Sequence, residues 1–407
     1  MTTTFPPMIT RDGSPASSLW SLEPGASHLN HGSFGGVPVR VLDEQANLRQ
    51  RMESNPVRWF CEVPALIAEA RVAVASQLGV ALETVALIPN ASAGASVVYQ
   101  SLANRGPVNI MVTSHGYGAV VMGAERLARS TGGSLHTVDI PLEASADTVT
   151  QLVDDALSAH PTDLLVIDQI TSATARAFPT TDLCSTAHAH HALVLVDGAH
   201  APGVLEHPVE TEADVWVGNL HKFWCAPRGA AVLVRNNPEL DLYPLIDSWS
   251  SPDPFPARFD YQGTLDVTPW LCAPLAHQFL ADEFGWEAIR RHSAQAMDVA
   301  VAQAAEVLAG MGVSDPVPDV GQPVGPMRLV RLPGDHAWTH DEVDALRVPF
   351  MDATGCIVSF TNVGKEGFMR LSAHAYTTHE DISVLVSSGI PALTTWTGST
   401  PHERKNQ

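Results

Sequence analysis

Short apolar runs alternate with longer amphipathic stretches through the middle of the chain. Runs that are hydrophobic on both faces and bounded by turn residues are typical of strands buried within a parallel sheet. Five such runs span residues 108–113, 164–170, 192–196, 215–217 and 230–234. Residues 118–130 and 148–158 have the apolar spacing of helices. The alternation predicts an α/β fold, with a mostly parallel sheet flanked by helices and ligands bound beyond the carboxyl ends of its strands.

The pattern changes in the last third of the chain. Residues 243–270 are rich in proline, aspartate and aromatic side chains, which predicts an irregular connection. A smaller α+β lobe is expected after it, with helices over 286–311 and 341–354, strands over 327–332, 356–360 and 368–373, and a last helix from Glu380. Thr377 and Glu380 have the spacing of a capping box for that helix.

The length of the chain favours more than one domain. A single hydrophobic core rarely serves 407 residues, and 45% hydrophobic residues with 16% charged residues fit a folded protein. We expect a large domain over 36–283 and a small C-terminal domain over 284–398. An N-terminal segment, 1–35, is expected to pack with the small lobe, and residues 399–407 are expected to form a disordered tail.

Charge and cysteine content narrow the classes of partner. The net charge of −21 opposes binding to nucleic acid or to anionic membrane surfaces, so a small-molecule substrate is favoured. The five cysteines are scattered without CxxC pairs, which is typical of a reduced compartment. The sequence shows neither a signal-peptide pattern nor an apolar run of membrane length, and we expect a cytoplasmic protein.

A lysine and an aspartate lie at the ends of two neighbouring buried runs. Lysine occurs only at Lys222, Lys365 and Lys405, and Lys222 alone follows a buried run. Asp197 ends the neighbouring run, where a desolvated carboxylate needs a cation. A lysine that can form a Schiff base and a carboxylate that holds a pyridine nitrogen protonated are what pyridoxal phosphate requires.

A phosphate site is also predicted. Ala91, Ser92 and Ala93 lie between a short apolar run and a helical stretch, so backbone N–H groups at the start of this helix could bind the cofactor phosphate. An ordinary helix cap at Asn90 or Ser92 explains the same residues equally well.

The motifs together resemble a known family. Residues 196–203, VDGAHAPG, followed by His221-Lys222 and by residues 226–229, APRG, resemble the class V aminotransferase group of fold-type I pyridoxal-phosphate enzymes. Residues 28–35, HLNHGSFG, and 55–60, NPVRWF, resemble isopenicillin N epimerases and their relatives. The resemblance extends from about residue 28 to about residue 390, and it implies the fold-type I architecture.

The resemblance also implies roles for individual residues. Lys222 matches the lysine that forms the Schiff base, Asp197 the carboxylate at the pyridine nitrogen, and His200 the contact to the phenolic oxygen. Tyr117 matches the ring stacked on the cofactor, with His115 as the alternative. The positions that match phosphate-binding residues are Ala91, Ser92, Ala93, Asn219 and His221. Gln169 matches a polar residue that borders the cofactor. Gly263 and Thr264 match a pair that reaches the neighbouring subunit's phosphate, which implies a homodimer. Arg370 matches the arginine that binds the substrate carboxylate, and Asn30, Ser33 and Arg58 are further substrate-binding candidates.

Some positions depart from the family pattern. Leu265 stands where relatives often carry an arginine. Arg176 and Arg228 either compensate for the missing cation or lie on the surface, and we favour a surface position for both. The loop before Arg370 lacks the cysteine of cysteine desulfurases, and Cys356 is interpreted as a buried small hydrophobic residue. His188, His190 and His191 lack further ligands in the sequence pattern, so we predict no metal.

Three reactions can follow once an amino acid is bound as an external aldimine and Lys222 acts as the general base at Cα. Elimination of a β-substituent needs one base, whereas epimerisation asks for a second acid, and no second residue stands out. We therefore favour a C–S lyase that acts on a cysteine-derived conjugate in secondary metabolism, such as antibiotic biosynthesis. The alternatives are an isopenicillin N epimerase-like epimerase, a decarboxylation coupled to oxidative deamination, and a catalytically silent scaffold.

Overall fold

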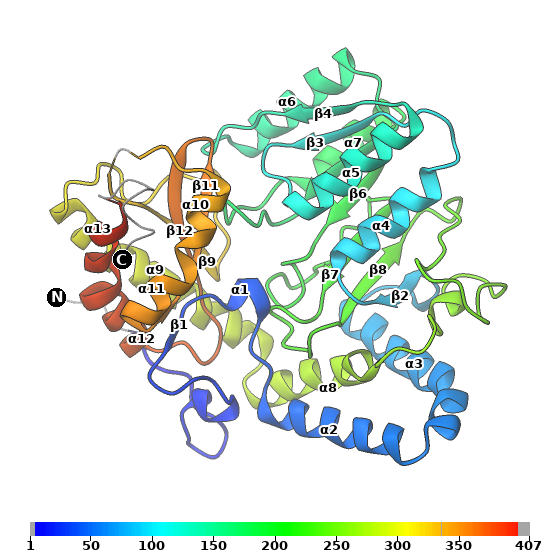
Figure 1. Ribbon diagram of the computed structural model, residues 1–407, viewed down its shortest axis with the longest axis horizontal. Helices are drawn as coiled ribbons and strands as arrows, with labels where there is room; N and C mark the ends of the chain where they lie inside the picture. Colours follow the sequence, from blue (N-terminus) through cyan, green and yellow to red (C-terminus); the bar gives the residue numbers. More distant parts are fainter. Residues whose placement is uncertain (1–4, 335, 398–407) are drawn as a thin grey trace. The chain divides into compact units, whose positions relative to one another are not determined.

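The computed structural model describes residues 5–334 and 336–397, which form two compact units (Figure 1). The larger unit comprises residues 37–172 and 177–282. The smaller unit comprises the described residues of 1–36, 173–176 and 283–407. The tail predicted at 399–407 lies outside the described residues.

A seven-stranded sheet forms the centre of the larger unit, with the strand order β2-β8-β7-β6-β5-β3-β4. The strands are β2 (Val85–Ile88), β3 (Ile110–Thr113), β4 (Leu135–Val138), β5 (Leu164–Asp168), β6 (Leu193–Asp197), β7 (Val215–Asn219) and β8 (Ala231–Arg235). Neighbouring strands from β4 to β7 pair in parallel, whereas β8 is antiparallel to both β7 and β2. The predicted α/β architecture with a mostly parallel sheet is confirmed.

Helices pack on both faces of this sheet because its strands are apolar on both faces. The helices of the larger unit are α2 (Val39–Ser54), α3 (Pro56–Leu78), α4 (Ala91–Leu102), α5 (Gly118–Thr131), α6 (Ala146–Ala159), α7 (Thr180–Ala189) and α8 (Thr268–Glu283). Apolar residues of α4 and α5 form one buried cluster with alternate residues of the strands, on the near side of the sheet in Figure 1. Close approach of α4 to β7 requires a glycine, because a Cβ at Gly94 would lie 2.5 Å from Val217 Cγ1.

A three-stranded antiparallel sheet forms the centre of the smaller unit. Its order is β11 (Ser359–Val363), β12 (Glu366–Ser372) and β9 (Met327–Arg331), so β12 is the central strand. A two-stranded parallel sheet joins β1 (Ser27–His28) to β10 (Cys356–Ile357). The helices are α1 (His31–Phe34), α9 (Trp286–Gly310), α10 (His340–Ala345), α11 (Arg347–Thr354), α12 (His379–Val384) and α13 (Ile390–Thr397). Residues of α9, the sheet and the C-terminal helices share one apolar core.

The predicted helix over 341–354 is wrong, because the chain forms α10 and α11 with a break at Leu346. Pro349 explains the break, since a proline inside one continuous helix would lose a hydrogen bond and clash with the preceding turn. Within α11 the same proline lies in the first turn, where its missing N–H costs nothing. The predicted strand over 356–360 is likewise divided, because residues 356–357 pair with β1 whereas residues 359–363 pair with β12.

The predicted capping box is wrong by one residue. Thr378 caps α12, and its partner is Asp381. The hydroxyl of Thr377 instead accepts a hydrogen bond from the His374 backbone at 3.0 Å. The sequence allows two capping boxes, Thr377 with Glu380 or Thr378 with Asp381. Only tertiary contacts select between them.

The remaining connections are short or irregular. Between β8 and α8 the only regular element among the described residues is a 3₁₀ turn, η3 (Ala257–Phe259), as the sequence predicted for this stretch. Other short turns are η1 (Ala16–Leu19), η2 (Leu82–Thr84) and the π-helical segment η4 (Leu385–Gly389). Across the described residues, no helix combines the length and the apolar character needed to cross a membrane.

Candidate functional site

Lys222 lies just beyond the carboxyl end of β7, beside His200 from the loop after β6. The Lys222 Nζ is 2.9 Å from His200 Nε2. An ammonium group can only donate, so it donates to the Nε2 lone pair and the His200 proton lies on Nδ1. His200 is buried and Lys222 half-buried, so the amine has a proton acceptor held away from bulk solvent.

Two buried carboxyl groups lie side by side at the same edge of the sheet. Asp168 ends β5 and Asp197 ends β6, and the two residues are direct partners in the parallel register. Burial raises the pKa of Asp197, while the Ala199 backbone N–H and the Lys222 charge lower it. The pKa of Asp168 is raised well above its usual range, first by burial and then by the Asp197 charge. Asp197 is therefore the member of the pair that ionises first.

Asp168 is a site residue that the sequence analysis did not single out. Its carboxyl group accepts a hydrogen bond from the backbone N–H of Tyr117, the residue that precedes α5. Asp168 therefore fixes the backbone from which the Tyr117 ring projects. A carboxylate at the end of a buried strand, the same signal that identified Asp197, could have found it.

A tryptophan orients the neighbouring amide side chain. The indole Nε1 of Trp216 donates to Gln169 Oε1 at 2.9 Å, which leaves the Gln169 amide N–H groups directed away from the tryptophan. The ring of Trp216 packs so tightly that a Cβ at Gly198 or at Gly218 would lie 2.2 Å from it. Gly198, the first glycine of the VDGAHAPG motif, is thus required by its packing against Trp216 beneath the site.

The first turn of α4 is held by two asparagine side chains. Asn219 Oδ1 accepts from the Ala91 backbone at 2.9 Å, and Asn90 Oδ1 accepts from Ala93 at 2.9 Å. Ser92 is half-buried between them. Asn219 therefore ties the start of this helix to the end of β7, the strand that precedes Lys222.

The other cofactor candidates differ in how well their geometry suits the predicted role. Tyr117 is 44% exposed, whereas the alternative ring, His115, is buried and its Nε2 contacts the Ile140 carbonyl at 2.9 Å. His221 Nδ1 lies 3.1 Å from the Ala230 carbonyl, so this nitrogen carries the proton. Burial lowers the pKa of His221 to about 4, which leaves its other nitrogen an acceptor and disfavours direct contact with a phosphate.

Three of the four substrate-binding candidates lie together in the smaller unit. Arg370 Nη2 donates to Ser33 Oγ at 2.7 Å, and Ser33 Oγ donates to Asn30 Oδ1 at 2.7 Å. Arg58 is exposed in the first turn of α3. Thr264 is exposed, and Gly263 has a φ of +82°, a left-handed conformation that favours glycine.

Several secondary candidates have ordinary structural partners. His188 pairs with Asp214 at 3.0 Å and His190 with Asp154 at 2.8 Å, so the two histidines face different carboxylates. Cys356 belongs to the apolar core of the smaller unit, and burial raises the pKa of its thiol.

The two additional arginines differ from each other in the structure. Arg228 is exposed. The interpretation of Arg176 as a surface residue is wrong, because its side chain is fully buried. The backbone of Arg176 forms a bridge with Pro323, which places this short segment within the smaller unit.

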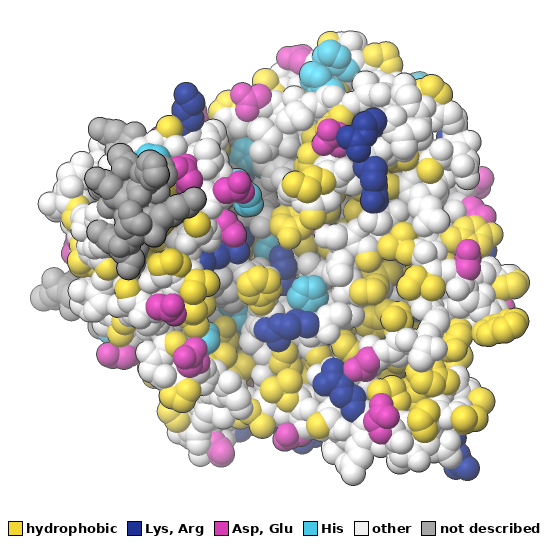
Figure 2. Space-filling model, viewed as in Figure 1, with side chains coloured by type: hydrophobic (Ala, Val, Ile, Leu, Met, Phe, Trp, Pro, Cys, Tyr) yellow, Lys and Arg dark blue, Asp and Glu magenta, His cyan; other side chains and the backbone are white. Residues whose placement is uncertain are grey.

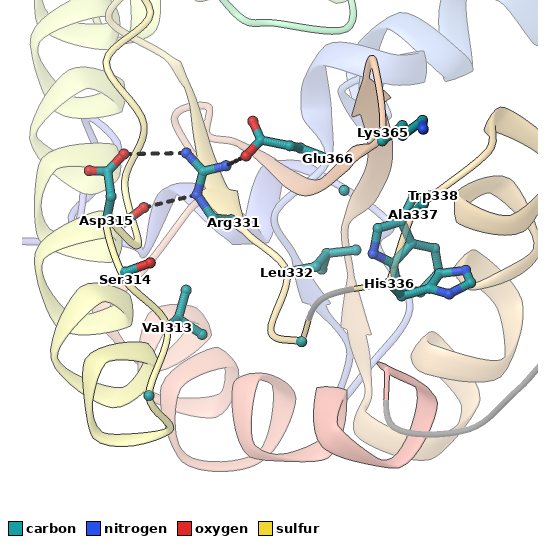
Figure 3. A pocket seen from close by; sticks show the side chains of 13 residues that line it. Val313, Ser314, Asp315, Arg331, Leu332, His336, Ala337, Trp338, Lys365 and Glu366 are labelled. Atoms are coloured by element: carbon teal, nitrogen blue, oxygen red, sulfur yellow. Dashed lines mark hydrogen bonds and ion pairs between the residues drawn. The ribbon is translucent and has the colours of Figure 1, made fainter.

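A cavity of about 540 Å³ in the smaller unit contains none of the predicted site residues. Figure 3 shows Arg331 at its wall, paired with Asp315 and Glu366. Lys365, at the turn between β11 and β12, is exposed and points away from this cluster in Figure 3. Lys405 lies outside the described residues. Of the lysines that the structure describes, Lys222 alone follows a buried strand.

Comparisons with known proteins identify the family and the fold. The family model for class-V aminotransferases matches residues 36–385. An isopenicillin N epimerase from Streptomyces clavuligerus is 29% identical over 95% of this chain and 100% of its own length. An L-cysteine desulfhydrase-like protein from Epichloe uncinata is 26% identical over 68% of this chain and 67% of its own. The structure of a cysteine desulfurase from Thermococcus onnurineus superposes with a TM-score of 0.74, at 18% identity, covering 94% of this chain and 98% of that one.

The chain belongs to the class-V aminotransferase family. The predictions of a fold-type I architecture and of a pyridoxal-phosphate enzyme of this family are confirmed. The relatives include both an epimerase and a desulfhydrase-like protein, so membership of the family leaves the reaction open.

Replacing Asp168 by asparagine should flatten the dependence of stability on pH. Because the folded-state pKa is raised, the stabilising contribution of Asp168 is present at low pH and is lost as pH rises from about 4 through the raised pKa. Asp168→Asn cannot titrate, so the decline should become shallower by up to about 1.4 kcal/mol per pH unit.

Urea unfolding of the cofactor-free protein at a series of pH values from about 5 to 8 measures this slope. Asp43→Asn, on an exposed position of α2, is the matched control and should leave the wild-type slope unchanged. An unchanged slope in Asp168→Asn would show that Asp168 does not hold a proton in this range.

Proposed function

We propose that this member of the class-V aminotransferase family is a pyridoxal-phosphate-dependent C–S lyase that acts on a cysteine-derived amino acid. The observation that carries the proposal is the group of Lys222, His200 and Asp197 at the carboxyl edge of the large sheet, with Lys222 Nζ 2.9 Å from His200 Nε2.

The buried charges of this edge fit the cofactor. Asp168 and Asp197 are two carboxyl groups whose pKa values respond to one shared cation, Lys222. A protonated pyridine nitrogen would supply a second positive charge and would stabilise the ionised form of Asp197. In the first turn of α4, the Ala91 and Ala93 N–H groups already donate to Asn219 and Asn90. We therefore assign the Ser92 backbone N–H to a phosphate, with the positive end of the helix dipole behind it.

Pyridoxal phosphate, when bound, supplies a carbonyl carbon that binds amines and a ring that accepts the electron pair left at Cα when a bond to it breaks. Lys222 is the amine for the covalent link and afterwards the base at Cα. Its partner His200 can accept a proton through Nε2, so Lys222 can become a neutral amine while the positive charge passes to the His200 ring. We assign to Tyr117 the contact with one face of the ring and to Gln169 its border.

Arg370, in the smaller unit, is proposed to bind the substrate α-carboxylate, because a guanidinium group matches a carboxylate in shape and charge. The hydrogen bond that Arg370 donates to Ser33 supports a fixed orientation of the guanidinium. Leu265 removes the cation that relatives often carry after the Gly-Thr pair, which favours a substrate without a distal anion.

A C–S lyase needs one base at Cα, and Lys222 with His200 supplies it. The second candidate is an amino-acid epimerase, which is favoured by the match of the Streptomyces epimerase over its whole length. That reaction needs a further acid on the opposite face of Cα, and we assign no residue to this role.

The link to Lys222 has a direct test. Borohydride reduction of the wild type should fix the cofactor on the peptide that contains Lys222, and mass spectrometry of the digest detects the added mass. Lys222→Ala should give no adduct, and Lys365→Ala, the matched control at an exposed lysine, should label like the wild type. An adduct of equal yield in Lys222→Ala would assign the link to another amine.

The reaction is tested by incubating the holoenzyme with S-substituted L-cysteines in D₂O. The lyase consumes one water and releases thiol, pyruvate and ammonium in equal amounts, because the C–S electron pair leaves on sulfur and the proton from Cα is taken up by Lys222. We expect these products from the wild type and a loss of at least about 1,000-fold in rate for Lys222→Ala. Deuterium incorporation at Cα with inversion and without pyruvate would favour the epimerase.

We also propose that the protein is a homodimer that buries an apolar patch of the larger unit. The patch consists of Tyr243, Leu245, Ile246 and Trp249, which are 42%, 43%, 50% and 92% exposed. These residues precede Gly263 and Thr264 in the same irregular connection, and a Cβ at Gly263 would lie 3.8 Å from Ile246. Figure 2 shows hydrophobic side chains gathered over the part of the larger unit around α4, β2 and this connection. Exposed apolar patches of this kind mark interaction surfaces.

Trp249→Asp should weaken the dimer by at least about 10-fold, because a large aromatic residue at an interface contributes more than 1 kcal/mol and the aspartate adds an unpaired charge. Sedimentation over a range of protein concentrations measures the dissociation constant. Val348→Asp, at another exposed apolar position outside the patch, is the control and should dimerise like the wild type. A monomeric wild type, or equal constants for Trp249→Asp and wild type, would refute the proposed interface.

A further inference from the structure

The N-terminal helix α1 of the smaller unit contacts the end of the central strand β12 and the residues just after it. Arg370 and Ser372 are alternate positions of β12, so their side chains lie on the same face of the strand, and His374 follows two residues beyond the strand end. Three successive residues of α1 contact these three positions in reverse order: His31 contacts His374, Gly32 contacts Ser372, and Ser33 contacts Arg370. We call this set the α1–β12 ladder.

The far end of the ladder is a packed aromatic contact. The rings of His31 and His374 stack with centroids 4.1 Å apart and an angle of 15° between their planes. His31 Nδ1 lies 2.8 Å from the Tyr376 hydroxyl and 3.5 Å from the Gly36 amide. An amide can only donate, so His31 Nδ1 is an acceptor and Tyr376 donates to it. This fully buried contact fixes the start of α1.

The middle of the ladder is a backbone contact. The Gly32 amide donates to Ser372 Oγ at 2.8 Å, and the Ser372 amide donates to the Leu29 carbonyl at 2.7 Å. Asn30 and Ser372 also form a parallel bridge. The segment before α1 is therefore held at the end of β12 by main-chain hydrogen bonds, which permit little sliding of one element along the other.

The near end of the ladder is a directed chain of hydrogen bonds. Ser33 has one hydroxyl proton, which it donates to Asn30 Oδ1 at 2.7 Å, so its lone pairs face the Arg370 Nη2 at 2.7 Å. Asn30 is in turn held by its amide nitrogen, 3.3 Å from the Val358 carbonyl. Each side chain in this chain has its donor and acceptor assigned, so the hydrogen bonds of Ser33 have one consistent direction.

We propose that Ser33 is a positioning residue that fixes the plane of the Arg370 guanidinium for a ligand carboxylate, and that Asn30 acts through Ser33. The proposal rests on the proposed function, in which Arg370 binds the substrate α-carboxylate. A planar guanidinium binds a carboxylate through two parallel hydrogen bonds only when its plane is correctly oriented. Arg370 is 4% exposed, so its orientation is set by the protein and not by solvent.

The test compares two ligands that differ only in the carboxylate. L-Alanine and L-alaninamide have no β-leaving group, and their binding to the holoenzyme is measured by titration of the cofactor absorbance. The wild type should bind L-alanine more tightly than the amide. Ser33→Ala should raise the dissociation constant of L-alanine by about 10-fold to 100-fold, the loss of one hydrogen bond to a charged group, and leave that of L-alaninamide unchanged.

Two further variants separate positioning from general damage to the fold. Ser33→Thr keeps the hydroxyl group and should restore most of the preference for L-alanine. Asn30→Ala keeps Ser33 but removes the acceptor of its hydroxyl proton. The preference for L-alanine over L-alaninamide should therefore fall, by a smaller factor than in Ser33→Ala. Ser18→Ala, at an exposed serine of the same N-terminal segment, should bind both ligands as the wild type does.

The outcomes distinguish this inference from the proposed function. If wild type prefers L-alanine and Ser33→Ala keeps the full preference, Ser33 does not position Arg370, while the function of Arg370 stands. A wild type that binds neither ligand, or that does not distinguish them, refutes the role of Arg370 and the inference with it. Equal weakening of both ligands in Ser33→Ala would show a general structural role and would overturn the positioning role.

Discussion

Two carboxyl groups buried side by side constrain the site in the larger unit. Asp168 and Asp197 are register partners at the ends of β5 and β6, and desolvation penalises a charge on each of them. One cation, Lys222, lowers the pKa of both, and Asp197 gains a further hydrogen bond from the Ala199 backbone. The pair is therefore asymmetric. Asp197, which accepts from the Ala199 backbone, is the more acidic member, and Asp168, which accepts from the Tyr117 backbone, is the less acidic one.

This asymmetry links the strand ends to the packing beneath them. The two carboxyl groups stay fixed only if β5, β6 and β7 stay in register, and Trp216 supports that register from below through Gln169 and two closely packed glycines. Asn219 extends the same strand end to the first turn of α4. The layer that positions the charged groups is thus tightly packed, and its polar side chains, Gln169 and Asn219, are held by hydrogen bonds. Such a layer can hold in place charges that water would otherwise solvate.

Sequence patterns predicted the parts of this molecule that depend on local periodicity. The buried runs identified the strands of the large sheet, and the order of strand ends identified Lys222 and Asp197. Asp168 does not stand out at a strand end in the sequence, because the apolar run 164–170 continues past it. The division into α10 and α11, and the capping of α12 by Thr378, depend on choices between adjacent registers that tertiary packing makes.

The contacts of Arg370 could not be derived from periodicity at all. Ser33 and Arg370 are 337 residues apart in the chain, and no local pattern indicates that α1 lies along β12. The motif that contains Asn30 and Ser33 indicated substrate binding only through resemblance to a family. In the structure Ser33 uses its hydroxyl on Asn30 and Arg370, and Asn30 uses its amide on Ser33 and on the Val358 carbonyl, which makes an indirect role the simpler explanation for them.

The orientation of the substrate α-carboxylate affects which reaction takes place at Cα. An enzyme that removes a proton from Cα must present that C–H bond to its base, and the substrate is oriented about Cα by whatever binds its carboxylate. If Arg370 binds the carboxylate, the plane of its guanidinium selects which bond to Cα is activated. Enzymes that share a lysine and a carboxylate of this kind can then differ in reaction without changing those groups, because a small rotation at the site that binds the substrate carboxylate presents a different bond. The hydrogen bonds from Arg370 through Ser33 to Asn30 oppose such a rotation in this chain.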